Sequence, residues 1–335
     1  MKKSLLMCLV VTLAGVLILA QYASAAPASR TITWTFPLTT AGKAIPSMVT
    51  EMGKVLLERT NGKFTWKVGR FEELGYKGPE MLQIYESGQQ KIGQLGGPYV
   101  ASEEPVLALL SLPLTSTLEN IPAKIKAFRP FVEERLDKHN IKLLSMIDNP
   151  NQIWSKIELN TMDDVKKLKI RAHPEFIRVM VNLGGTGVTM PLAEIYQALA
   201  TGIINSAGFS AVGGWPIGFG DVTKFLYLSP LVGSATHFMV VNKTAFNSLP
   251  KDVQKVLIDT ANEYEPKMIR AALILPAPMR AEMEKKIKIY DSLNPQLVEQ
   301  MTKIGAVPVW KKWIEKYPQT KPAVDSLLKA SGITW

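Results

Sequence analysis

Short segments with the periodicity of strands alternate with longer segments that have the periodicity of helices, and this alternation limits the folds open to the chain. Strand-like patterns occur at residues 31–36, 64–68, 91–95 and 141–147. Helical spacing lies between them at 44–59, 79–86 and 117–140. Strands that alternate with helices form sheets connected by crossover helices. We therefore predict an α/β protein.

The second half of the chain continues the pattern around one arginine. Arg171 ends a short strand, and a helix with Pro191 at its first position and Gly202 just past its end follows. Proline and glycine at these places are typical of helix boundaries. Further helices are expected at 173–183, 293–303, 309–317 and, with kinks or breaks at Pro266, Pro276 and Pro278, at 249–290. Further strands are expected at 187–190, 224–228 and 237–242.

The N-terminus has the pattern of a secretory signal peptide. A basic start at Lys2 and Lys3 precedes an apolar run from Leu5 to about residue 20, and Ala23-Ser24-Ala25 forms a small-residue cleavage site. An uncleaved anchor is the alternative, but the run is shorter than the roughly 20 residues that a span needs. We expect cleavage after Ala25 and export to the periplasm.

Composition narrows the function of the exported chain. Cys8, the only cysteine, lies in the leader, and the remaining chain is long enough to bury a core without disulfides. The formal charge is +10, and it becomes +8 when Lys2 and Lys3 leave with the leader. The basic residues are scattered among acids and form no basic–aromatic motif, so we expect no nucleic acid partner. A mild positive field favours anionic ligands.

Arg171 is the residue whose chemistry is most specific. A planar guanidinium at the end of a strand suits bidentate capture of a carboxylate, although it could also be a surface ion-pair partner. His139, His173 and His237 lie far apart in the sequence, so no metal site and no cofactor are expected. Residues 208–212 lack the final glycine of a nucleophile elbow. These observations argue against an enzyme.

Several segments together resemble the periplasmic solute-binding proteins of TRAP transporters, the DctP-type family. They are the leader, the opening strand, residues 58–63 (ERTNGK), the Leu112-Pro113 step and the stretch 164–210. The most specific parts are 169–171 (KIR), 190–199 (MPLAEIYQAL) and 201–204 (TGII). The resemblance covers nearly all of the exported chain.

The resemblance implies a two-lobed α/β binding protein with hinge strands and a long connecting helix. It implies that Arg171 grips the carboxylate of a small organic acid and that membrane TRAP permease subunits are the partners. We expect a monomer. The expected bounds are 1–25 for the signal peptide, 26–150 plus about 237–275 for the first lobe, and 151–236 plus about 276–335 for the second.

Departures from the family pattern indicate a less polar pocket. Many members have a second arginine where this chain has Asn151, and a phenylalanine where it has Leu192. Phe209 stands at an amide or tryptophan position, and Gly208 replaces the preceding acid, which argues against a bound metal. The loop from Gly96 to Tyr99 also lacks charge. The predicted ligand-binding residues are Arg171, Phe209, Asn151, Leu192, Tyr99 and Gly96.

One charge-fixing arginine in such a pocket predicts a monocarboxylate with an apolar or aromatic body, because a second buried carboxylate would be unpaired. Phe209 could stack on that body, or it could pack between the lobes. Two other functions stay open: an exported ligand-sensing subunit of a signalling system, and a secreted enzyme.

Overall fold

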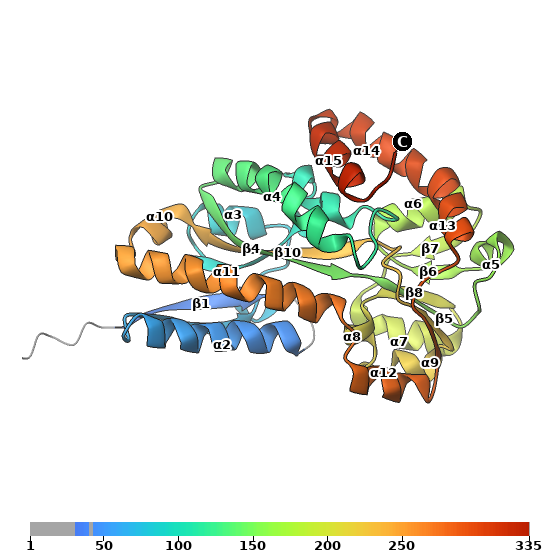
Figure 1. The fold of residues 1–335 in the computed structure, drawn as a ribbon, viewed down its shortest axis with the longest axis horizontal. Coiled ribbons are helices and arrows are strands. Elements are labelled where there is room, and N and C mark those ends of the chain that lie inside the picture. Colours follow the sequence, from blue (N-terminus) through green and yellow to red (C-terminus); the bar gives the residue numbers. More distant parts are fainter. Residues whose placement is uncertain (1–30, 40–42, 335) are drawn as a thin grey trace, which may run out of the picture.

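The computed structural model describes residues 31–39 and 43–334, and the predicted signal peptide lies outside them. It has two lobes of mixed helices and strands (Figure 1), so the predicted fold class is confirmed. The long helix α11 (Lys251–Leu273) runs along the first lobe toward α12 (Ala277–Glu284) in the second. No helix within the described ranges is long and apolar enough to cross a membrane.

The first lobe is built on two small sheets. Strands β1 (Ile32–Leu38) and β2 (Phe64–Arg70) pair in parallel, connected by α2 (Ala44–Arg59). Strands β3 (Ile92–Gly96), β10 (Ser234–Asn242) and β4 (Ile141–Pro150) form an antiparallel sheet in that order. Apolar residues of α2 recur at helical spacing and are buried: Ile45, Val49, Met52 and Leu56. Helices α2 and α11 pack together, whereas α4 (Ile121–Lys138) contacts β4 separately.

The second lobe contains a six-stranded sheet. Its order is β11 (Lys288–Tyr290), β9 (Phe225–Tyr227), β5 (Gln152–Ser155), β8 (Ser206–Phe209), β6 (Lys169–Arg171) and β7 (Thr186–Val188). Its helices include α5 (Met162–Lys166), α6 (Pro174–Asn182), α7 (Leu192–Thr201), α8 (Ala211–Gly214) and α9 (Phe219–Val222). The carboxyl ends of β6 and β8 place Arg171 and Phe209 at one edge of this sheet.

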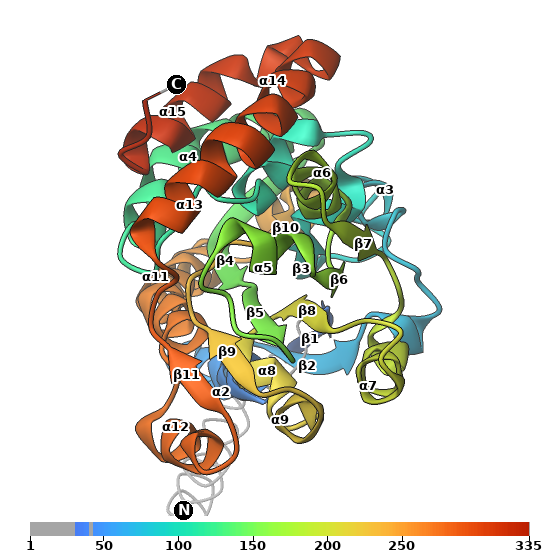
Figure 2. The ribbon, with the colours of Figure 1, turned by 90° about the vertical axis from the view of Figure 1, so that its right-hand side faces the viewer.

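Besides the connection from α11 to α12, the chain crosses between the lobes at two neighbouring places. Only Asn151 separates β4 from β5, and its backbone N–H donates to Gly233 O at 2.9 Å, in the segment that leads into β10. The C-terminal segment contains α13 (Pro295–Met301), the π-helical turn η4 (Thr302–Ala306), α14 (Val307–Lys316) and α15 (Lys321–Ala330). It spans both lobes (Figure 2), because α15 packs on α4 while η4 packs on α6. The lobe bounds 26–150 plus 237–275 and 151–236 plus 276–335 therefore stay a proposal.

The helix α11 continues through Pro266 and ends before Pro276, so the expected break lies at the second proline. Two other features of the secondary structure differ from the prediction. Residues 288–290, expected to be helical, form the edge strand β11 beside β9. Strands β5 and β8 were not expected, because β5 is buried at every position and β8 is made mostly of small residues, so neither has the alternation of a half-buried strand.

Candidate ligand-binding site

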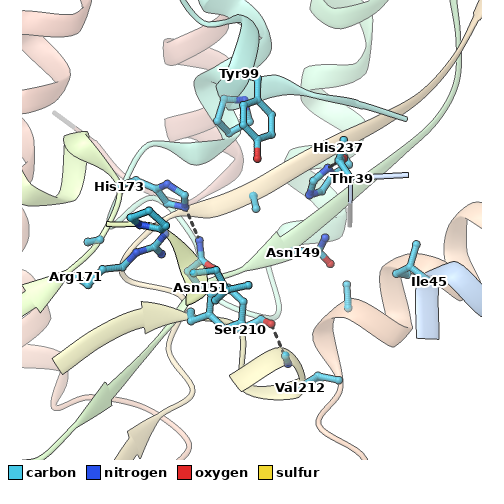
Figure 3. Close-up of a pocket in the computed structure, with 18 of the residues that line it drawn as sticks. Thr39, Ile45, Tyr99, Asn149, Asn151, Arg171, His173, Ser210, Val212 and His237 are labelled. Atoms are coloured by element: carbon cyan, nitrogen blue, oxygen red, sulfur yellow. Dashed lines mark hydrogen bonds between the residues drawn. The ribbon is translucent and has the colours of Figure 1, made fainter. Parts of the chain in front are cut away.

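A cleft of about 580 Å³ lies between the two lobes and receives side chains from both (Figure 3). The second lobe contributes the carboxyl ends of β6 and β8 and the start of α7. The first lobe contributes Thr39 after β1, the start of α2, Tyr99, and His237 of β10. Among the described residues that line the cleft there is no aspartate or glutamate, and the cations are Arg171 and the exposed Lys43 at the start of α2.

Arg171 holds its guanidinium against backbone carbonyls. Its Nε and Nη2 both donate to Met190 O at 3.2 Å, and Nη1 donates to Gly208 O at 3.4 Å. No carboxylate of the described chain pairs with it. Burial lowers the pKa of Arg171, which reports the cost of holding this cation away from water and from any anion.

The hydrogen bonds of Arg171 leave a defined part of the side chain available. A guanidinium has five N–H groups, and the carbonyls of Met190 and Gly208 take three of them. One N–H then remains on each terminal nitrogen, and a carboxylate can accept from two such groups when they point the same way. A partly buried cation with unused donors and no counterion among the described residues has the chemistry that suits a carboxylate.

Asn151 and His173 form a neutral pair beside the arginine. Asn151 Nδ2 lies 3.0 Å from His173 Nε2 and donates to it. His173 occupies the N-cap position of α6. Burial, and then the nearby Arg171, lowers the pKa of His173 to about 4, so the ring is uncharged at pH 7. The pair adds hydrogen-bonding groups to this wall without adding charge.

Phe209 and Leu192 provide the apolar part of the same wall. Phe209 is half-buried, and its ring centroid lies 5.8 Å from that of Phe219. Leu192, at the start of α7, is 38% exposed. Gly208, before Phe209, has no room for a side chain, because a Cβ there would lie 2.5 Å from Val232. The glycine at a position where relatives often have an acid thus has a packing reason.

The opposite wall carries Tyr99 and His237. Tyr99 is 49% exposed and points into the cleft (Figure 3). Gly96 is not among the lining residues. It lies behind Tyr99, since a Cβ at Gly96 would come within 2.7 Å of the ring. The other five predicted residues (Arg171, Phe209, Asn151, Leu192 and Tyr99) all line the cleft.

Sequence reasoning missed the two histidines and Thr39. His173 stands two residues after Arg171, so its place at the end of the same strand could have suggested it. Thr39 Oγ1 lies 2.9 Å from His237 Nδ1, although the two residues are 198 positions apart. No local sequence pattern predicts a contact between residues so far apart in the chain.

Comparison with known proteins agrees with this architecture. Residues 39–316 match the family model of bacterial extracellular solute-binding proteins, family 7. The 2,3-diketo-L-gulonate-binding periplasmic protein of Escherichia coli (strain K12) is 26% identical over 268 residues, covering 74% of each chain. A monocarboxylate 2-oxoacid-binding periplasmic protein of Nostoc is 25% identical over 222 residues, covering 61% of this chain and 58% of the relative.

A solved structure shares the fold. It is a Bordetella pertussis extracytoplasmic solute receptor that binds pyroglutamic acid, and it superposes with a TM-score of 0.75 at 23% identity. The match covers 90% of this chain and 99% of the receptor.

Proposed function

This chain belongs to the bacterial extracellular solute-binding proteins of family 7, and we propose that it captures a monocarboxylate with an apolar or aromatic body. Members of this family are solute receptors that work with membrane permease subunits, not enzymes. The proposal places the carboxylate on Arg171 and the body against Phe209 and Leu192. The two lobes then close over the ligand in a hinge motion.

The observation that carries the proposal is the half-buried Arg171 cation without a carboxylate partner in the described chain. Holding an unpaired charge partly away from water is costly, and a bound anion reduces that cost. The unused N–H groups on the two terminal nitrogens lie in the plane of the guanidinium, and this arrangement suits a planar anion such as a carboxylate.

The surroundings of Arg171 favour one carboxylate rather than two. Asn151 and His173 beside it are uncharged at pH 7. Lys43 is exposed, so a second carboxylate near it would gain only a screened interaction. A dianion bound deep in the cleft would leave one carboxylate unpaired. The pyroglutamic acid of the Bordetella receptor and the 2-oxoacids of the Nostoc protein are also monocarboxylic.

Transport is the role that we propose, with a TRAP permease as the membrane partner and the periplasm as the location. The predicted cleavage after Ala25 belongs to the same proposal.

Phe209 also contacts Phe219, so part of its role is packing within the second lobe.

A screen of organic acids tests the ligand class. Thermal shifts of the mature protein are measured with apolar and aromatic monocarboxylates, with succinate and malate, and with sialic acid, and mass spectrometry identifies any acid that co-purifies. We expect stabilisation by the first group and little by the others. Submicromolar binding of a C4-dicarboxylate, with no response to any apolar monocarboxylate, would refute the proposal.

A further inference from the structure

The protonated ring nitrogen of His237 can be identified from the hydrogen bonds of Thr39 and Gln94. The backbone N–H of Thr39 lies 2.9 Å from Gln94 Oε1, so the oxygen of the Gln94 amide is the atom that faces Thr39. The Thr39 hydroxyl also lies 2.9 Å from Gln94 Oε1. Because an amide oxygen only accepts, the hydroxyl must donate its one proton to Gln94.

The oxygen of the Thr39 hydroxyl is then an acceptor for the imidazole. His237 Nδ1 lies 2.9 Å from it, so Nδ1 carries the ring proton. In a neutral imidazole the other nitrogen, Nε2, is therefore unprotonated. Burial lowers the pKa of His237 to about 4, which keeps the ring neutral at pH 7.

His237 Nε2 is left without a partner in the described part of the chain, although only 8% of the residue is exposed and it lines the cleft (Figure 3). Across the cleft, the wall with Arg171 offers donors: the free guanidinium N–H groups, and Nδ1–H of His173, since its Nε2 accepts from Asn151. One wall thus presents donors for an anion, and the other presents a neutral acceptor.

We infer that His237 Nε2 selects acids whose body carries an uncharged O–H or N–H donor. The inference rests on the proposed function, because Arg171 must hold the carboxylate while the body reaches the other wall. An ammonium group is not the expected donor, since no carboxylate among the described lining residues would pair with it. Thr39 and Gln94 are positioning residues that act by fixing the tautomer of His237.

The test compares acids that have a hydrocarbon body with derivatives that carry a hydroxyl group at different positions on that body. Calorimetry of the mature protein is carried out with phenylacetate and its three ring-hydroxylated isomers, and with butyrate and its 3- and 4-hydroxy derivatives. The wild type should prefer at least one hydroxyl derivative over its parent by about tenfold or more, because the parent leaves a desolvated acceptor unsatisfied.

Variants separate His237 from the rest of the cleft. His237→Leu should reduce the preference to about one, and Thr39→Val should reduce it partly, since the tautomer is no longer fixed. His139→Gln is the matched control, because His139 pairs with Glu86 and Glu104 and does not line the cleft, and it should keep the full preference.

The outcomes distinguish this inference from the proposed function. Acids that bind through Arg171 without any preference for a hydroxyl would overturn the inference alone. Failure of every acid to bind the wild type would overturn both. Nitrogen-15 NMR of the ligand-free protein should show His237 protonated at Nδ1. Protonation at Nε2 would overturn the inference even if His237→Leu does not fold.

Discussion

The two walls of the cleft are polar in different ways. The wall of the second lobe holds a half-buried cation, Arg171, which lines the cleft and bonds only to backbone carbonyls of the described chain. The wall of the first lobe holds a neutral relay from Gln94 through Thr39 to His237. Charge attracts any carboxylate strongly, whereas a neutral acceptor distinguishes among carboxylates. On the two proposals above, affinity depends mainly on the second lobe and selectivity on the first, so a ligand that satisfies both walls also connects the lobes.

The largest expected effect is on the charged wall. Arg171→Ala should weaken binding of a monocarboxylate by about a hundredfold, and tenfold is the smallest loss that fits the proposal, because charge-assisted hydrogen bonds contribute about 1.5 kcal/mol or more each. Arg171→Lys should lose most of the same affinity, since a point charge does not reproduce the planar donor pair. Calorimetry with the acid found in the screen measures both.

Arg178 provides the matched control for that experiment. It lies on α6 close to Arg171 in sequence, but its side chain is 59% exposed and pairs with Glu175. Arg178→Ala should bind like the wild type. A folded Arg171→Ala protein with unchanged affinity would show that the carboxylate binds elsewhere.

The next largest expected effect comes from the neutral histidines, His173 and His237, and it concerns how the folding stability depends on pH. The folded pKa values of His173 and His237 are about 4, below the usual value of about 6.5. Their unfolded forms take up protons first as the pH falls, so stability is complete above about pH 6.5 and is lost toward pH 4. Each histidine should lower the free energy of unfolding by about 1–2 kcal/mol between pH 7 and pH 5.

Chemical denaturation of the wild type and of His237→Gln at both pH values measures this loss. The variant should lose less stability between pH 7 and pH 5, whereas an equal loss would show that His237 is not held neutral.

NMR titration of the two histidines compares the electrostatic surroundings of the two walls. Arg171→Met should raise the pKa of His173, whose neighbour it removes, and leave that of His237 unchanged.

The smallest expected effect concerns the apolar surface. Phe209→Asn should weaken an acid with an aromatic body by about 2–10-fold, since ring contacts contribute about 0.5–1.5 kcal/mol beyond area burial. A small hydroxy acid that does not reach the ring should change less. Phe209→Leu, which keeps an apolar side chain, is the control and should retain more of the affinity than Phe209→Asn. Equal losses for both acids in Phe209→Asn would indicate that Phe209 only packs on Phe219.

Much of the fold could be predicted because its signals are local. The helix 44–59 was predicted with its observed bounds, since its apolar residues repeat every three or four positions and a turn signal follows. Strands β5 and β8 could not be found, because a strand buried on both faces or built from small residues has no alternation. The strand β11 was mistaken for helix beside a true helix, since its three residues are too few to show a period.

The sequence by itself determined the order of most helices and strands, the family, and the place of Arg171 at a strand end. Periodicity, capping and short motifs are properties of neighbouring residues, so they can be read from neighbouring letters. Only the tertiary structure decided that Asn151 meets His173 and that Thr39 connects Gln94 to His237. Those contacts depend on how segments distant in the chain come together, as β10 does with β3, and burial in the cleft then holds both imidazoles neutral.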